Sequence, residues 1–464
     1  MENKTLEEKN KNPQNASMSY SDRLHNVIPA GAHTYSRGDD QYPSNAPQIL
    51  DRGKGAYVWD PDGKKYLDYG MGLRSVTVGY DYDEISEGAI AAIRKGNNLP
   101  RPVMLELEAA ELMVSLFPWA EMVKFAKNGS AVTSAAVKLA RAYTGRKYVA
   151  VCAEQPFFSY DDWFIGSTPV DKGIPDETKK LTLKFHYNNL ESLEKLFSDH
   201  PGEIACVIME PATFVSPINN EGPVITDKQK YTDHAVNFLH QVKSVCKKNG
   251  AVFILDEMIT GFRWDLHGAQ ALYDIEPDLA TFGKGMANGF PLSALIGKRE
   301  IMDLGGIRKQ GAERVFLIST THGSEMSSFG AFIKTIEVYK KLDVTGHHWS
   351  YGKKLMTGLN DIAKNYGVEK YFSSAGFACS PYYFTRDKSG EISLELRTLF
   401  SQEMIRSGVL FAWISLAYAH GATELDMTLA AADKAMKVYR AALDEGVDKY
   451  LEGPAIKPVF RKYN

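Results

Sequence analysis

Apolar and polar positions follow two different periods along this chain. Between residues 103 and 331, short apolar runs alternate with stretches in which apolar residues recur every three to four positions. The short runs predict buried strands and the longer stretches predict amphipathic helices. The predicted strands cover residues 123–126, 147–153, 204–209, 251–255, 278–282 and 292–298. Repeated strand–helix units favour an α/β fold, in which helices cover both faces of a mostly parallel sheet.

The two ends of the chain have other patterns. Residues 55–69 alternate around a Pro-Asp-Gly turn at 61–63, which predicts a β-hairpin. Helices are expected at residues 21–28, 83–95, 105–117, 131–145, 227–248, 329–343, 396–409 and 424–447. The first residues are polar and lack the apolar stretch of a signal peptide, so we expect a flexible tail.

Composition narrows the class of protein. With 464 residues, 44% of them hydrophobic and 24% charged, the chain is expected to form one large and one smaller globular domain. A net charge of −3 gives no basic surplus for nucleic acid or an anionic membrane, and no apolar run approaches the ~20 residues that span a bilayer. The four cysteines are scattered without metal-binding spacing, which indicates buried thiols in a reducing cytoplasm and no metal site.

Two predicted strands end in residues that can carry chemistry. The strand at 251–255 runs into Asp256, and the strand at 278–282 runs into Lys284, which lies between two glycines. Ligands of α/β proteins bind beyond the carboxyl ends of the strands, so we expect both side chains to face one crevice. A carboxylate can keep a pyridine nitrogen protonated, and a lysine of lowered pKa can form an imine, so the pair suits pyridoxal phosphate. Taken singly, an aspartate is more often a cap or ion-pair partner, and a lysine a surface charge.

Residues 128–130 form a candidate phosphate site. Asn128, Gly129 and Ser130 follow one predicted strand and open the helix predicted at 131–145. The free N–H groups and the dipole at a helix N-terminus attract an anion. A plain turn with Ser130 as the helix cap explains the same residues equally well.

Longer segments resemble the class III pyridoxal-phosphate aminotransferases, in the branch similar to glutamate-1-semialdehyde aminomutase. The resemblance rests on residues 127–146, 253–263, 277–302 and 319–324, and it extends over about residues 20–446. It implies the PLP-dependent transferase fold type I, with a large domain around a seven-stranded, mostly parallel sheet and a smaller α+β domain from both chain ends. We therefore expect a tail at 1–19, a small-domain segment at 20–75, the large cofactor-binding domain at 76–331, and the rest of the small domain at 332–464.

The resemblance also implies roles for residues around the cofactor ring. Lys284 would form the internal aldimine with pyridoxal 5′-phosphate and later move the proton. Asp256 would pair with the pyridine nitrogen. Met258 and Phe157 would pack on the two faces of the ring.

Further residues are implied to hold the phosphate. These are Gly129, Ser130, the N–H of Ala131, and Thr320 of a neighbouring subunit. The last of them implies a homodimer with the active site at the interface.

Two arginines are candidates for binding the substrate. Arg37 lies where the aminomutase has an arginine for the substrate carboxylate, although an exposed arginine is an equally good interpretation of this Gly- and Tyr-rich loop. Arg74 is the second candidate.

Several positions depart from the aminomutase pattern. Ala131 replaces an acid, residues 157–160 replace Tyr-His-Gly-His, residues 214–215 replace Gly-Asn, Leu73 replaces a tryptophan, and Ala417 replaces a glutamate. The cofactor residues are kept while substrate positions change, which favours an aminotransferase acting on another carbonyl compound. We expect ping-pong transamination from a donor such as glutamate to an oxo-sugar or oxo-cyclitol; the Tyr, Trp and Asp residues within 156–164 suit a polyhydroxylated ligand.

Alternatives remain at this point. An aminomutase would move the amino group within one molecule. A non-catalytic relative would bind cofactor without turnover, although the presence of both Lys284 and Asp256 argues against it. A dinucleotide-dependent dehydrogenase is excluded, because no GxGxxG follows an early strand with an acid ~20 residues on.

Overall fold

The computed structural model describes residues 18–155, 157–218 and 221–464, so almost the whole predicted tail lies outside the described residues. Its strands are β1 (Arg52–Lys54), β2 (Tyr57–Trp59), β3 (Lys65–Asp68), β4 (Met122–Ala126), β5 (Tyr148–Cys152), β6 (Thr182–Phe185), β7 (Ile204–Met209), β8 (Val224–Ile225), β9 (Val252–Asp256), β10 (Leu279–Phe282), β11 (Ser293–Gly297), β12 (Phe372–Phe377), β13 (Ser380–Thr385) and β14 (Val409–Leu410). Its longer helices are α2 (Tyr20–Val27), α4 (Asp83–Ile93), α5 (Met104–Leu116), α6 (Gly129–Thr144), α9 (Leu190–Asp199), α10 (Phe238–Asn249), α12 (Met326–Leu342), α13 (Val344–Asn365), α14 (Leu394–Arg406) and α15 (Ala422–Glu445). One-turn helices are α3 (Met71–Arg74), α7 (Asp162–Ile165), α8 (Asp176–Lys179) and α11 (Arg299–Met302).

A seven-stranded sheet forms the middle of the molecule, in the order β4-β11-β10-β9-β7-β5-β6. The pairings β10–β9, β9–β7, β7–β5 and β5–β6 are parallel, whereas β11 runs antiparallel to both of its neighbours. The predicted α/β class and the largely parallel sheet are therefore confirmed. The parallel strands end at one edge of this sheet, where ligands of such folds bind.

Alternating side chains along the strands divide the sheet into two faces. Ile208 on β7 and Ile254 on β9 pack with the apolar face of α6, in one core cluster. Their neighbours Val207 and Phe253 pack with α10 on the opposite face. Both faces are covered by helices, which is why these strands are apolar at every position.

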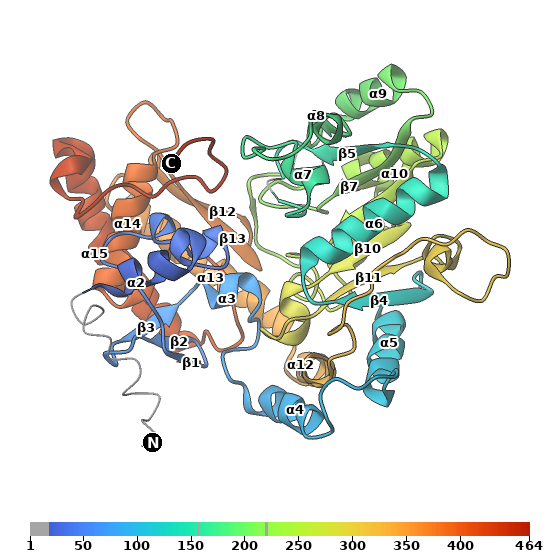
Figure 1. Cartoon of the computed structure of the whole chain (residues 1–464). Helices are drawn as coiled ribbons and strands as arrows, with labels where there is room; N and C mark the ends of the chain where they lie inside the picture. Colours follow the sequence, from blue (N-terminus) through green and yellow to red (C-terminus); the bar gives the residue numbers. More distant parts are fainter. Residues whose placement is uncertain (1–17, 156, 219–220) are drawn as a thin grey trace.

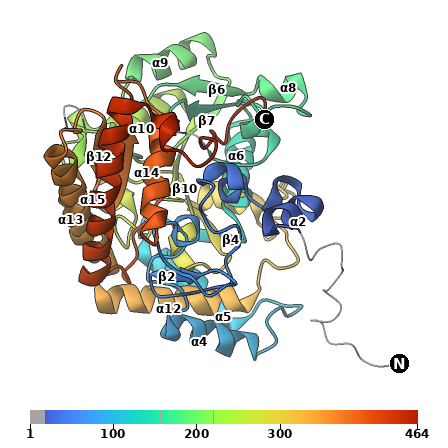
Figure 2. The same cartoon turned by 90° about the vertical axis from the view of Figure 1, so that its left-hand side faces the viewer.

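The two ends of the chain pack together. The predicted hairpin forms as β2 and β3, and β3 pairs with the C-terminal β14 in a four-stranded sheet, β1-β2-β3-β14. One core cluster joins residues 56–69 to residues 351–443. Figures 1 and 2 show the blue N-terminal strands beside the orange and red C-terminal helices. The proposed domain boundaries stay a prediction.

Two local predictions were wrong. The helix expected at 227–248 begins only at Phe238, because the Asn237 side chain caps the N–H of Leu239 and the preceding residues run along the segment near Tyr273. The strand β6 was not predicted, since its apolar run is short and interrupted by a lysine. No helix within the described residues is long and apolar enough to cross a membrane.

Candidate active site

Asp256 ends β9 with its carboxylate buried and oriented. Its Oδ1 accepts hydrogen bonds from the Met258 N–H and from the Thr281 hydroxyl, both at 3.0 Å. Thr281 lies opposite Asp256 in the parallel register of β10 and β9. Burial raises the pKa of Asp256 to about 6, against the opposing charge of Lys284 and these hydrogen bonds.

The adjacent acid, Glu257, points to the other face of the sheet. It accepts from the hydroxyl of Thr260 and from the N–H groups of Ala269 (3.0 Å) and Gln270 (2.8 Å). Burial raises the pKa of Glu257 to about 7. Successive strand residues point in opposite directions, so Glu257 holds a loop in place while Asp256 is left to the crevice.

Lys284 follows β10 and shares the electrostatic environment of Asp256. Its backbone φ is +38°, an uncommon conformation for a lysine. Burial lowers the pKa of Lys284 below its ordinary value, and the nearby cations of Arg74 and Arg263 act in the same direction. The carboxylates of Asp256 and Glu210 oppose this shift. A lysine with a lowered pKa can act as a nucleophile or a base at neutral pH.

Glu210 is a second buried carboxyl group at the same sheet edge. It directly follows β7, whose residue Met209 is in register with Leu255 on β9, so Glu210 lies beside Asp256. Burial raises the pKa of Glu210 to about 8, and the neighbouring Asp256 charge adds to this shift. Ionisation of one carboxyl group disfavours ionisation of its neighbour, so we expect Glu210 to be the neutral member of the pair at pH 7.

Met258 lies between the Lys284 loop and the N-terminus of α6. A Cβ added to Gly283 would lie 2.5 Å from its sulfur, and a Cβ added to Gly129 would lie 2.9 Å from it. The two glycines therefore leave room for an apolar floor between the lysine and the helix N-terminus. This is the position at which the sequence predicted an apolar contact for the ring.

The N-terminus of α6 lies directly beyond β4, as predicted. Asn128 is its cap and accepts from the Ala131 N–H at 2.9 Å. The Ser130 hydroxyl accepts from the Tyr160 N–H at 3.1 Å and keeps its own proton for a further acceptor. An anion at this end can therefore use the Gly129 and Ser130 groups directly, whereas the Ala131 N–H must first leave its Asn128 cap.

Three other predicted residues are exposed. Phe157 is 45% exposed, and its ring lies near those of Phe164 and Phe460, at centroid distances of 6.0 and 6.4 Å. Thr320 is exposed on the long segment before α12. Arg37 is exposed in a short 3-10 turn (Tyr35–Arg37), where its charge acts on Tyr42.

Arg74 occupies an unusual backbone conformation. The four residues from Met71 to Arg74 all have positive φ, and the values for Leu73 and Arg74 are +58° and +71°. Left-handed backbone costs roughly 1–2 kcal/mol for each residue other than glycine. Such strain persists only where the surroundings enforce it.

The surroundings of this left-handed turn do enforce it. The buried Asp68 carboxylate accepts from the N–H groups of Gly70 (2.7 Å) and Met71 (2.8 Å), and from the Tyr80 hydroxyl (2.7 Å). The same hydroxyl accepts from the Gly72 N–H at 2.7 Å. We refer to this arrangement as the Asp68–Tyr80 clamp.

A buried arginine, Arg263, also supports the left-handed turn at residues 71–74. Arg263 donates to the backbone oxygen atoms of Arg74 (3.0 Å) and Leu416 (2.8 Å). Burial lowers the pKa of Arg263 to about 10, which leaves it charged at neutral pH. It therefore ties the turn to the C-terminal part of the chain and adds positive potential beneath Lys284.

Several of these residues were not found from the sequence. Thr281 could have been found, because it is a polar residue within the apolar run that ends two residues before Lys284. In the structure it lies opposite Asp256 on the neighbouring strand. Glu210 could also have been found, because it follows a strand-like run and precedes a proline.

Arg263 had no such signal, since its backbone partners Arg74 and Leu416 are far away in sequence. The Asp68–Tyr80 clamp is local, but its glycine-rich stretch has no periodic pattern from which the turn could be predicted.

Together the residues fit a pyridine cofactor that carries a phosphate. A lysine of lowered pKa and an oriented carboxylate share one electrostatic environment, a helix N-terminus offers N–H groups, and an apolar floor lies between them. The space beside Gly129 and Gly283 is occupied by the Met258 side chain, which gives a flat ring an apolar surface to rest on. The predicted group is thus compatible with this site.

Comparison with known proteins agrees with this assignment. The class-III aminotransferase family matches residues 40–411. The chain is 31% identical to the glutamate-1-semialdehyde 2,1-aminomutase of Persephonella marina over 412 residues, covering 84% of this chain and 91% of that protein. The corresponding enzyme of Alkaliphilus metalliredigens is 29% identical, covering 89% and 94%. Among solved structures, the PLP internal aldimine form of the FumI protein from Sphingopyxis sp. MTA144 superposes with a TM-score of 0.78 at 26% identity, covering 92% of this chain and 97% of that one.

Proposed function

The chain belongs to the class-III aminotransferases, and on that premise we propose that it is a pyridoxal-phosphate-dependent enzyme that transfers an amino group from an amino donor to a carbonyl acceptor. One observation carries the proposal. Lys284 and Asp256 follow neighbouring parallel strands, and the buried charge of each shifts the pKa of the other. A lysine and a carboxylate so placed are what this cofactor needs in order to act.

Each residue has a defined task in this proposal. Bound pyridoxal phosphate would supply an electron sink for the carbon that loses or gains a proton. Asp256, held by Thr281, would pair with the ring nitrogen and favour its protonated form. Lys284 would hold the cofactor, and its Nζ would take and return the proton of the substrate. Gly129 and Ser130 hold the phosphate at the α6 N-terminus.

Replacement of the lysine tests the proposal. Lys284→Ala should abolish both the absorbance of covalently bound cofactor and turnover, while Lys340→Ala, at an exposed position of α12, should change neither. A Lys284→Ala protein that kept both properties would refute the proposal.

The nature of the acceptor rests on the sequence. The departures at Leu73 and at residues 214–215 support an acceptor other than glutamate-1-semialdehyde, and we propose an oxo-sugar or oxo-cyclitol, with glutamate as the candidate donor. The alternative is an intramolecular aminomutase, which is supported by the similarity to the two glutamate-1-semialdehyde 2,1-aminomutases described above. A half-reaction separates them, since a transaminase stops after one equivalent without a second substrate, whereas a mutase continues.

We also propose a homodimer, in which Thr320 reaches the phosphate of the partner's site. The segment that carries Thr320 is tied to the loop before α5, where Asn98 donates to the Thr321 carbonyl at 3.2 Å. Apolar side chains are exposed here: Leu99 in the loop is 44% exposed, and Met104, the first residue of α5, is 68% exposed. Exposed apolar surface of this kind is typical of a protein interface.

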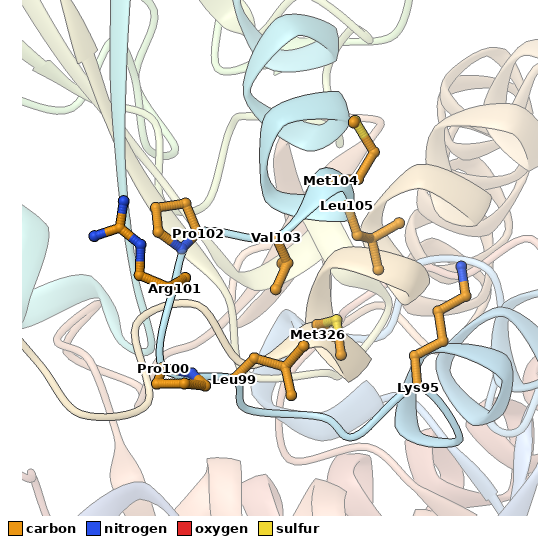
Figure 3. Close-up of a pocket in the computed structure, with 9 residues that line it drawn as sticks. All are labelled: Lys95, Leu99, Pro100, Arg101, Pro102, Val103, Met104, Leu105 and Met326. Carbon is orange, nitrogen blue, oxygen red and sulfur yellow. The ribbon is translucent and has the colours of Figure 1, made fainter.

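The same loop borders an apolar cavity of about 370 Å³. Figure 3 shows Leu99, Val103, Leu105 and Met326 converging on it. Met104→Asp should convert a dimer to a monomer in light scattering and weaken cofactor retention, while Ile392→Asp, at an exposed site in a distant turn, should not. A wild-type monomer would contradict this part of the proposal.

A further inference from the structure

We propose that Arg74 binds the carboxylate of the amino-acid donor and determines which donors the enzyme accepts. The inference rests on the proposed function and names a binding group that the cofactor assignment leaves open. It depends on the conformation of residues 71–74, on the partners of the guanidinium, and on the residues gathered around it.

The backbone at this position favours glycine, yet the chain has an arginine there. The φ of Arg74 is +71°, in the left-handed region. A glycine would occupy this conformation without strain, so the turn itself does not require an arginine, and the strained residue points to a role for its side chain.

The guanidinium of Arg74 has few partners among the described residues. It is half-buried, and its Nη1 donates to the Tyr382 hydroxyl at 3.2 Å, with the cation 5.0 Å from the centre of that ring. Within the described residues, no carboxylate forms an ion pair with it and Tyr382 is its one acceptor. A partly buried cation with unused donors calls for an anion from outside the chain.

The position of Arg74 brings that anion close to the reacting group. The Arg74 cation lowers the pKa of both Lys284 and Glu210, so it acts on the same buried charges as Asp256. A donor whose amine reaches Lys284 can therefore place its carboxylate at Arg74. A planar guanidinium with a free edge can pair bidentately with the two oxygens of a carboxylate, which is the anionic group that an amino-acid donor carries.

One departure from the aminomutase pattern lies beside the partner of Arg74. Phe214, which replaces the glycine of the Gly-Asn pair, packs edge-on against Tyr382 at a centroid distance of 5.7 Å. Residues 73–74, 214 and 382 come from three separate parts of the chain, yet Arg74 and Phe214 contact the same tyrosine. Tyr382 and Phe214 thus form an aromatic wall beside the Arg74 cation, which fixes the guanidinium on one side.

Binding of non-reactive carboxylates to the cofactor-loaded enzyme tests the inference. Glutarate and its neutral analogue glutaramide are titrated by calorimetry and by the absorbance of bound cofactor, with inorganic phosphate as a third probe. Wild type should bind glutarate at least ~10-fold more tightly than glutaramide. Arg74→Gly should lose about 10- to 100-fold in glutarate affinity, with an unfolding midpoint equal to or above that of wild type, since glycine relieves the strained φ.

Matched variants give the remaining outcomes. Arg74→Lys should restore part of the glutarate affinity that Arg74→Gly loses, and Arg94→Gln, at an exposed arginine that caps the end of α4, should keep the wild-type affinity. The inference is overturned if Arg74→Gly binds glutarate within twofold of wild type, if wild type does not prefer glutarate to glutaramide, or if only phosphate binding depends on Arg74. If the enzyme still binds its cofactor through Lys284, any of these results refutes only the role of Arg74, and the proposed function is unaffected. If wild type itself shows no absorbance of bound cofactor, the proposed function and the role of Arg74 are both refuted.

Discussion

The hydroxyl of Thr281 donates a 3.0 Å hydrogen bond to Oδ1 of Asp256, across two neighbouring parallel strands. Because the Met258 N–H binds the same oxygen, the carboxylate is held in one orientation. This leaves Oδ2 for a proton-bearing partner. The strand register therefore sets the direction in which the carboxylate acts.

Removal of this hydroxyl should weaken the charged form of Asp256. In Thr281→Val the carboxylate loses one donor, so its pKa rises and its orientation loosens. A hydrogen bond to a charged group contributes about 1.5–3 kcal/mol, so we expect kcat to fall roughly 10- to 100-fold, with the loss greatest at low pH. Thr281→Ser keeps the hydroxyl and should retain most of the activity. A Thr281→Val enzyme with an unchanged pH–rate profile would contradict the assigned role.

The narrow space at Gly283 should be intolerant of one methyl group. Its φ of −176° is open to any residue, so only the contact with the Met258 sulfur opposes a side chain. Gly283→Ala should cost about 1–3 kcal/mol of unfolding free energy and weaken cofactor binding. Denaturant unfolding and cofactor titration measure the two effects.

A double variant identifies the cause of this loss. Gly283→Ala combined with Met258→Ala should recover stability relative to Gly283→Ala alone, because the sulfur is gone. Gly222→Ala, at a position with open space, serves as the control. If the double variant is no more stable than the sum of its single variants predicts, the contact is not the reason for the glycine.

Acid should destabilise the protein through His420. Its Nδ1 accepts from the Ala417 N–H and its Nε2 donates to the Asp68 carbonyl, both at 3.0 Å, so the neutral ring is the form that fits. Burial lowers its pKa to about 4 from an ordinary 6.5. Between these two pH values His420 is protonated in the unfolded chain but not in the folded chain. The free energy of unfolding therefore falls as the pH drops from 6.5 to 4, by up to about 3 kcal/mol.

The His420→Gln variant measures this contribution. Its unfolding free energy should depend less steeply on pH between 6.5 and 4 than that of wild type, although it is lower at pH 7. His33→Gln, at an exposed histidine, should follow the wild-type slope. Parallel pH dependences for wild type and His420→Gln would show that this ring does not control acid stability.

The opposite pH trend is expected from Glu210. Burial and the adjacent Asp256 raise its pKa from 4.5 to about 8, so between these values the unfolded state is ionised and the folded carboxyl is not. Stability from this group is present below pH 4.5 and is lost as the pH rises toward 8. Glu210→Gln should therefore gain stability relative to wild type as the pH increases from 5 to 8. Equal pH trends in Glu210→Gln and the surface variant Glu194→Gln would refute this.

The positions of Asp256 and Lys284 could be predicted from the sequence for a local reason. A short apolar run between predicted helices is too short for a buried helix, so it is predicted as a buried strand. The residue that follows or ends the run then lies at the edge of the sheet. The same reasoning located β4 and the N-terminus of α6 around Gly129. Where local pattern was weak, prediction failed, as at β6 and at the start of α10.

The chain's amino-acid pattern thus determined the fold class and the cofactor-binding residues of the site, because the ends of strands and the starts of helices depend on residues that are neighbours in the sequence. Tertiary packing determined the rest of the site. The register of β7 against β9 placed Glu210 beside Asp256, and the packing of the 71–74 turn and of the segment after β7 against β13 brought Arg74 and Phe214 to Tyr382. Such contacts join residues up to 308 positions apart and leave no periodic signal, so they exist only once the chain has closed on itself.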